Sequence, residues 1–357
     1  MNSPPSPSVS PAPATPPVGA FWLLVLAAAS VLLVTTGVRM SLGLYVAPIN
    51  EATGLGIAAI SFALAVAQIM WGVAQPLFGA LADRFGPGLS LFVGAVMMAA
   101  GMALTPFVDS SLGLTLSLGV LVAGGAGAGS FSVLLGAVSL RLPAARRAFA
   151  SGLINAGSSF GQFVFAPLSQ WLIAGFGLAT ALFSLAVIAL LTIPVSWPLR
   201  HKAEHPEGGG AVGVGMTDQL RIAFADRSYW CLHAGFFACG FHIAFLATHL
   251  PGAVDLCGLP GSVSANSLAL IGLANIFGGL GAGWLAQRYR MKWLLFWMYA
   301  SRAVMVGLYL VAPKTDLTFY VFAFGLGLTW LATVPPTAGL VGKLFGLRYL
   351  GTLFGLT

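Results

Sequence analysis

The chain is a succession of apolar runs separated by short polar connections. Each run is about twenty residues long, enough for a helix to cross a hydrocarbon layer of about 30 Å. The pattern predicts membrane-spanning helices over 21–46, 57–81, 89–107, 112–140, 149–173, 178–198, 229–250, 265–286, 293–312 and 318–341. An eleventh helix is expected to begin around residue 350. The predicted fold is therefore all-α and embedded in a membrane.

The chain also contains an internal repeat. Residues 79–85 read Gly-Ala-Leu-Ala-Asp-Arg-Phe and residues 283–289 read Gly-Trp-Leu-Ala-Gln-Arg-Tyr, each after an apolar run, and residues 147–151 have a weaker echo at 348–352. Two copies of one spanning unit are the usual architecture of a secondary transporter, whose site lies between them. The first copy ends near Arg200. Because the chain stops at Thr357, we expect the second copy to lack most of its fifth helix and all of its sixth.

These features divide the chain into four parts. Residues 1–19 are rich in Pro, Ser and Ala without a charged side chain, which predicts a disordered cytoplasmic tail. Residues 20–198 form a six-helix bundle, and residues 229–357 form a second, incomplete bundle. Residues 199–228 are polar, contain three consecutive glycines and are interpreted as a cytoplasmic linker that permits relative motion of the bundles.

Composition excludes a water-soluble protein, because charged residues make up 7% of the chain, against about a quarter in soluble domains. Taken alone, the net charge of +7 would suggest a nucleic-acid partner. The distribution of the charges along the chain indicates another origin. With a cytoplasmic amino terminus, Lys314 is the one basic residue expected in an outer loop. Arg39 and Arg302 fall inside predicted spans, and the other basic residues are expected in inner loops. This positive-inside distribution predicts a multi-pass protein of the cell's inner membrane, without a nucleic-acid partner. The three cysteines have no metal-binding spacing, and no metal or cofactor is predicted.

The motif over residues 79–86 has a readable physical logic. Gly79 and Gly86 permit close packing and a sharp turn, and Asp83 can accept hydrogen bonds at the start of the next helix. The motif resembles the loop between helices 2 and 3 of the major facilitator superfamily, twelve-helix transporters with two pseudo-symmetric six-helix bundles. That resemblance extends over residues 20–357 and implies a conformational latch formed by Gly79, Asp83, Arg84, Gly86, Arg146 and Arg147. The alternative is a capped turn without a latch. In the second copy Gln287 replaces Asp83, so any latch there is weaker.

A second segment narrows the resemblance. Residues 146–161 are similar to the helix-5 signature of monocarboxylate transporters, in the basic pair, the Ala-x-Gly spacing and the Ala-Gly-Ser-x-x-Gly ending. Phe149 and Ile154 depart from that signature, and the Asp-Gly pair of these carriers at the start of helix 1 is missing. The resemblance implies the monocarboxylate or oxalate–formate branch and a small organic anion as substrate.

Two arginines lie inside predicted spans, where a charge is costly unless it is paired or hydrated. Arg39 falls within 21–46, and the resemblance implies that helices 1, 4, 7 and 10 line the path, so Arg39 is placed to bind an anion. Its planar fork suits a carboxylate. A snorkelling or structurally paired arginine is the alternative. For Arg302, within 293–312, a ligand role and an interior tie to carbonyls both stay open.

Histidines and amides supply the other candidates. His242 lies nearest the centre of 229–250 and is the candidate for substrate binding and for the coupling proton, because histidine changes charge near neutral pH. His233 and His249 are interpreted as structural. Asn155 and Gln162 are placed near the site, and Trp330 is placed on its opposite wall. Glycines at 124, 125, 127, 129, 157, 161, 279 and 283 predict closely packed helices.

The combined prediction is a monomeric secondary transporter of a small organic anion, a monocarboxylate, working by alternating access with proton coupling. Efflux of hydrophobic drugs or metabolites by the same fold is the alternative. A membrane-embedded enzyme would need a nucleophile–base pair or a set such as His-Glu-x-x-His, which the sequence lacks. A sensor without transport activity is a further alternative, and such a protein would normally contain a soluble signalling domain.

Overall fold

A computed structural model describes residues 18–139, 141–142, 144–200, 216–345, 353–354 and 356–357. These residues form helices and connecting turns without a strand, which confirms the predicted all-α fold. Eight helical segments are long and apolar enough to cross a membrane, and one of them, Gly152–Val195, is long enough for two crossings. Most of the predicted tail over 1–19 lies outside the described residues.

The first span of the first bundle is a helix that changes from α to 3-10 and back to α. It consists of α1 (Val18–Ser41), a 3-10 segment (Leu42–Tyr45) and α2 (Val46–Thr53). The second and third spans are α3 (Ile57–Phe85) and α4 (Pro87–Leu104). The fourth span combines α5 (Ser111–Leu114), a π-helical stretch (Thr115–Val122), α6 (Ala123–Ala128) and α7 (Phe131–Ser139). The fifth and sixth spans are both assigned to α8 (Ala144–Val195), which turns at Gly177, where φ is +78°.

The second bundle contains α10 (Arg227–Leu256), α11 (Gly261–Arg288), α12 (Met291–Val311), α13 (Asp316–Gly327) and α14 (Val334–Phe345). A further helix, α9 (Met216–Ala225), lies within the segment interpreted as a linker. The helix predicted over 318–341 is broken between α13 and α14, before Pro335-Pro336. The two prolines instead fall in the first turn of α14, where a missing N–H leaves no helical hydrogen bond unmade.

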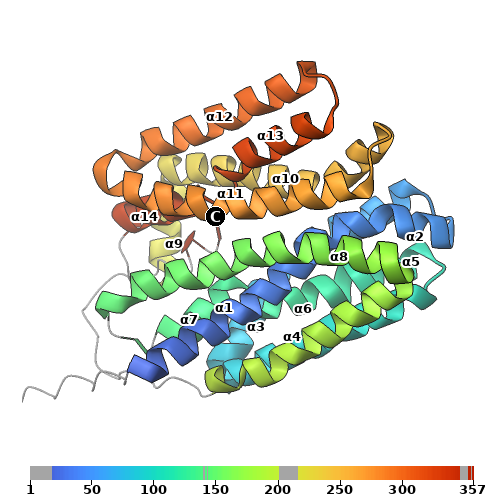
Figure 1. Ribbon diagram of the computed structural model, residues 1–357. Helices are drawn as coiled ribbons and strands as arrows, with labels where there is room; N and C mark the ends of the chain where they lie inside the picture. Colours follow the sequence, from blue (N-terminus) through green and yellow to red (C-terminus); the bar gives the residue numbers. More distant parts are fainter. Residues whose placement is uncertain (1–17, 140, 143, 201–215, 346–352, 355) are drawn as a thin grey trace, which may run out of the picture.

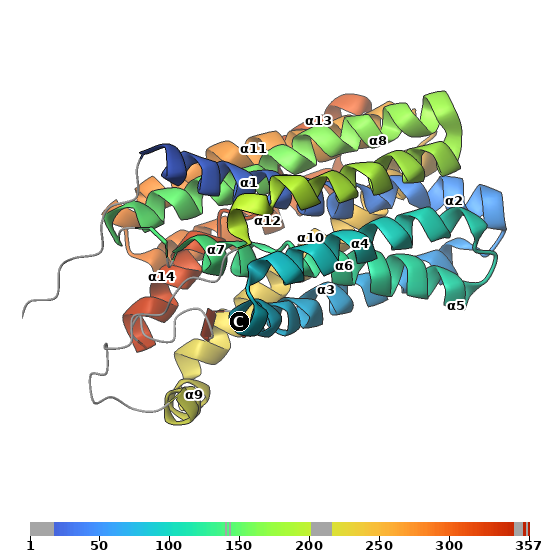
Figure 2. The same ribbon diagram turned by 90° about the horizontal axis from the view of Figure 1, so that it is seen from below.

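The two bundles lie side by side, with α8 against α11 (Figures 1 and 2). The start of α1, α7, α9 and α14 lie at one end of the molecule, which we call the basic end, and α2 and α5 lie at the other. The alternation of the helices places ten described basic residues at the basic end: Arg84, Arg141, Arg146, Arg200, Arg221, Arg227, Arg288, Arg290, Lys292 and Lys343. Lys314 lies at the opposite end, with Glu51, Asp109, Asp255 and Asp316.

Glycines bring α1 and α8 into backbone contact. A Cβ atom at Gly157 or Gly161 would overlap the carbonyl of Ala29 or of Leu33, which confirms the close packing predicted there. The same prediction is wrong for Gly79, Gly279 and Gly283, where a Cβ would meet no atom within 4 Å. In α11 the close contacts fall instead at two other glycines, Gly272 and Gly278.

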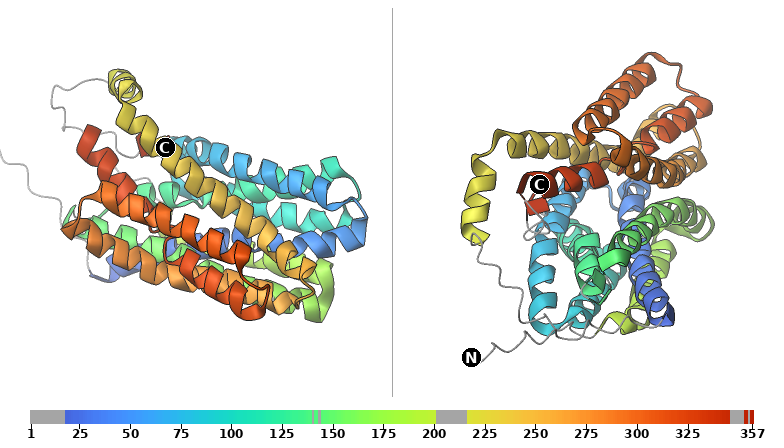
Figure 3. Two further views of the ribbon diagram at one scale, coloured as in Figure 1. Left: turned by 90° about the horizontal axis from the view of Figure 1, so that it is seen from above. Right: turned by 90° about the vertical axis from the view of Figure 1, so that its left-hand side faces the viewer.

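The bundles meet toward the end that carries α2. A Cβ at Gly43 would overlap the carbonyl of Ala247 in α10, and one at Gly261 would lie 2.7 Å from the side chain of Gln170. Midway along the interface, a Cβ at Gly272 would lie 2.7 Å from the carbonyl oxygen of Ser159 in α8. Figure 1 shows the bundles farther apart at α7 and α14, and the right-hand view of Figure 3, seen from the basic end, separates them into two groups of helices.

Two glycines of α8 offer a matched test of this packing. Gly161→Ala should lower the unfolding temperature of the purified protein in detergent, because overpacking costs about 1–3 kcal/mol. Gly152→Ala, on the same helix, should raise it, because a Cβ there meets nothing within 4 Å and alanine favours helix by about 1 kcal/mol. Equal shifts for both variants would contradict the α1–α8 contact.

Candidate functional site

Arg39 is a buried cation near the middle of the span Phe21–Thr53, with 7% of its surface exposed. The acidic residues that the structure describes lie in loops or near helix ends. Glu51 is twelve residues farther along, which corresponds to about 18 Å of helix. Among the residues that the structure describes, no carboxylate lies within 4.0 Å of the Arg39 guanidinium. Within this part of the chain, the charge is therefore left without a counter-ion.

Two side chains of α3 hold the guanidinium in place. Nη1 of Arg39 donates to Oε1 of Gln68 at 2.7 Å, and the guanidinium carbon lies 4.0 Å from the centre of the Trp71 ring. Nη2 makes only a long contact of 3.9 Å with Sδ of Met40, and Nε is buried without a hydrogen-bond partner. Nε and Nη2 share one edge of the guanidinium. This edge is the pair of donors that a carboxylate accepts side-on.

The surroundings compensate the charge only in part. An amide oxygen and an aromatic face attract a cation, the latter by about 0.5–2 kcal/mol. A buried cation without its counter-ion costs several kcal/mol more than that. The arrangement therefore favours binding of a small anion at the free edge. Gln68 and Trp71 are site residues that the sequence does not single out, although they lie one helical turn apart in a largely apolar segment.

The three histidines of α10 differ in their environments. His242 lies near the middle of α10, half-buried, and its Nδ1 is buried without a hydrogen-bond partner. His233 has its Nδ1 2.9 Å from the carbonyl oxygen of Tyr229, and His249 contacts the ring of Phe245. His233 and His249 thus contact neighbouring groups of their own helix, whereas Nδ1 of His242 has no hydrogen-bond partner. The described contacts do not join His242 to Arg39 directly.

The two amides proposed for the site lie on α8. Gln162 is 2% exposed, its Nε2 has no hydrogen-bond partner, and its Cβ lies beside Gly272 of the other bundle. Asn155 is half-buried. Gln162 thus lies where the two bundles meet.

Trp330 and Arg302 come together at the break between α13 and α14. Trp330 is fully buried, with its indole Nε1 unpaired. Arg302 donates from Nε to the hydroxyl of Thr329 at 3.2 Å, and from Nη2 to the carbonyls of Thr329 and Trp330, the latter at 2.6 Å. Sequence alone allows Arg302 either a ligand role or interior hydrogen bonds to carbonyls, and the structure shows the hydrogen bonds to carbonyls.

Of the residues predicted to form the latch, Gly79, Gly86, Arg84 and Arg146 have described surroundings. Gly86 joins α3 to α4 with φ of +91°, a left-handed conformation that glycine adopts readily, so the sharp turn is confirmed. The exposed guanidiniums of Arg84 and Arg146 lie over the rings of Phe85 and Phe21 respectively. The side chains of Asp83 and Arg147, like that of Gln287, lie outside the described part of the chain. Their pairing stays a prediction.

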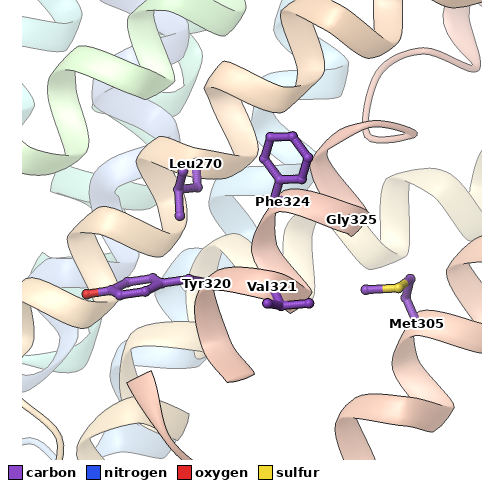
Figure 4. A pocket seen from close by; sticks show the side chains of 6 residues that line it. All are labelled: Leu270, Met305, Tyr320, Val321, Phe324 and Gly325. Atoms are coloured by element: carbon purple, nitrogen blue, oxygen red, sulfur yellow. The ribbon is translucent and has the colours of Figure 1, made fainter. Parts of the chain in front are cut away.

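A separate hollow of about 430 Å³ lies away from these residues, between α11, α12 and α13 (Figure 4). It is lined by Leu270, Met305, Tyr320, Val321, Phe324 and Gly325. The Tyr320 hydroxyl is the one polar side-chain group among the six. This hollow therefore does not suit an anion.

Comparisons with known proteins agree with the described fold. The Major Facilitator Superfamily profile matches residues 27–357. The chain is 29% identical to monocarboxylate transporter 13 of Bos taurus, covering 93% of this chain and 78% of that protein. It is 24% identical to the oxalate:formate antiporter of Oxalobacter formigenes, covering 95% of this chain and 81% of that protein.

Two solved structures share the architecture. A bacterial homolog of the human lysosomal transporter Spinster, in an inward-facing and unoccupied conformation, aligns with a TM-score of 0.70 at 15% identity, over 95% of this chain and 79% of its own. A D-xylose–proton symporter aligns with a TM-score of 0.63 at 16% identity, over 94% of this chain and 84% of its own. At these identities the likeness concerns the fold alone.

Exchanging Gln68 tests whether Arg39 lacks a counter-ion. Gln68→Glu keeps the hydrogen bond and adds a negative charge beside the guanidinium, so that the buried cation gains a counter-ion. The unfolding temperature should therefore rise. Gln68→Leu should lower it, because a buried donor that loses its acceptor costs about 1–3 kcal/mol. A destabilised Gln68→Glu protein would indicate that Arg39 is already compensated.

Proposed function

The chain belongs to the Major Facilitator Superfamily and is a multi-pass membrane transporter rather than an enzyme, and from this premise we propose that it carries a small monocarboxylate by alternating access. The observation that carries the proposal is the buried guanidinium of Arg39, held by Gln68 and Trp71 with the Nε–Nη2 edge free.

A carboxylate is the anion that best fits this edge. Its two oxygens match the two parallel donors, and its single charge neutralises the Arg39 guanidinium, beside which the described contacts place no carboxylate. Relatives named as monocarboxylate transporters and as an oxalate:formate antiporter support the same class of substrate. Efflux of apolar compounds is disfavoured, because an apolar ligand would leave Arg39 buried without a counter-ion.

The distribution of charge supports an orientation. Ten described basic residues lie at the basic end. The positive-inside rule therefore assigns that end, with the start of α1, to the cytoplasmic side of the cell's inner membrane. The close contacts of Gly43 with the Ala247 backbone and of Gly261 with the Gln170 side chain then close the outer side. We assign this conformation to the state that opens toward the cytoplasm, in a transporter that works as a monomer.

Proton coupling is assigned to His242. Its buried Nδ1 has no hydrogen-bond partner, and it lies near the middle of α10, at a depth similar to that of Arg39 in the first span. A histidine at this depth can take up a proton when an anion enters, because the added positive charge and the anion then stabilise each other. Proton and anion would cross the membrane together.

Neutralising Arg39 tests the anion site. Arg39→Gln should lower the affinity for a labelled short-chain monocarboxylate by more than about 100-fold, because a charged hydrogen-bonded pair contributes about 3 kcal/mol or more. Equilibrium binding to purified protein measures the loss. Arg290→Gln, an exposed arginine at the basic end, is the control and should bind normally. Retained affinity in folded Arg39→Gln protein would refute the assignment.

Replacing His242 tests the coupling proton. When the anion binds in weakly buffered solution, the unmodified protein should take up protons, which a pH indicator dye reports. His242→Gln should bind the anion with little or no proton uptake. His249→Gln, on the same helix, should behave like the unmodified protein. Unchanged proton uptake in His242→Gln would move the coupling site elsewhere.

A further inference from the structure

The break between α13 and α14 leaves backbone groups without helical partners inside the second bundle. Residues 328–333 form turns rather than helix, and Trp330, Ala332 and Thr333 within them are fully buried. In a membrane interior such freed groups must find partners within the protein. Three side chains, each from a different helix, supply these partners.

Arg302 and Cys239 form hydrogen bonds with the backbone carbonyl groups that the break exposes. Arg302 of α12, 2% exposed, donates to the carbonyls of Thr329 and Trp330, and Sγ of Cys239 in α10 lies 3.6 Å from the carbonyl of Trp330. These carbonyls follow the carboxyl-terminal end of α13, where the helix dipole favours a cation. Arg302 therefore fixes the first half of the break.

Asn275 of α11 connects the second half of the break to the other bundle. Its Oδ1 accepts from the backbone N–H of Leu331 at 2.8 Å, and its Nδ2 donates to Oγ of Ser159 in α8 at 2.7 Å. Asn275 is 3% exposed and Ser159 also 3%, so water does not compete at either bond. One amide thus joins the break to the first bundle.

We propose that Asn275 couples the relative position of the two bundles to the conformation of residues 328–333, and so positions Trp330. The bond to Ser159 crosses the α8–α11 interface, and it breaks when the bundles rock against each other. Asn275 is then held only by its bond to the Leu331 amide. Residues 328–333 gain conformational freedom, while Arg302 stays bound to the carbonyls of Thr329 and Trp330. Asn275 and Arg302 are positioning residues. The inference rests on alternating access from the proposed function, but not on the identity of the substrate.

Ser159→Ala isolates the link, because it removes the bond between the bundles and leaves the Asn275–Leu331 bond in place. One such hydrogen bond contributes about 1 kcal/mol, so the population with separated outer ends should rise about fivefold. Ser267→Ala is the matched control. Ser267 is also a fully buried serine, on α11, but its hydroxyl has no hydrogen-bond partner.

Two measurements on the full chain, both without any anion, test the coupling. Spin labels at Glu51→Cys and Asp255→Cys, in a background where Cys231 and Cys257 are serine, report the separation of the outer ends by pulsed electron resonance. Hydrogen exchange of the Leu331 amide reports the break. Ser159→Ala should increase both the long-distance population and the exchange rate by about the same factor, whereas Ser267→Ala should change neither. Asn275→Ala should increase exchange further.

A changed distance distribution with unchanged Leu331 exchange in Ser159→Ala would overturn the coupling. Unchanged distances would show that the Ser159 bond does not hold the bundles, which also overturns it. Because neither readout needs a ligand, failure of the anion assignment at Arg39 would leave this result intact, and the converse also holds.

Discussion

A charge in the apolar interior of a membrane protein must be compensated, and this requirement shapes both halves of the molecule. The acidic residues that the structure describes lie in loops and near helix ends, and neither Arg39 nor Arg302 finds a carboxylate among them. Each guanidinium is compensated in a different way. Arg302 binds backbone carbonyls that a broken helix exposes, whereas Arg39 binds an amide oxygen and an aromatic face and keeps one edge free. Arg302 is thus anchored to the protein's own backbone, with its Nη1 unpaired, whereas Arg39 has its Nε unpaired beside Nη2 on one edge.

The same principle links the broken helix to the interface between the bundles. The α13–α14 break persists because Arg302 and Asn275 satisfy the groups that it exposes. Asn275 can also reach Ser159 because Gly272, three residues before it, allows α11 to approach α8 closely. Small residues therefore set the spacing, and polar side chains then connect the elements that this spacing brings together. Asn275 is therefore the residue that connects the interface between the bundles to the hydrogen bonding at the break.

Much of this arrangement follows from the sequence, and the rest depends on which faces meet. Hydrophobic runs predict the spans because length and apolarity are local properties, and Arg39 stands out for the same reason. The contact of Arg39 with Gln68 and Trp71, and that of Asn275 with Ser159, join separate helices whose rotation no single segment specifies. Glycine spacing was a good guide at Gly157 and Gly161 but wrong at Gly279 and Gly283, since spacing does not say which face has a neighbour. The helix expected over 318–341 is broken before Pro335-Pro336, at the carbonyls that Arg302 binds.

The central claim is that the free edge of Arg39 selects a carboxylate by charge and shape. The most direct test compares binding of a short-chain monocarboxylate with that of its neutral amide, which has the same size and shape, to the purified protein by calorimetry. We expect measurable binding of the acid and at least about 100-fold weaker binding of the amide, because only the acid supplies the missing negative charge. Equal binding of the two, or binding of neither alongside binding of apolar compounds, would contradict it.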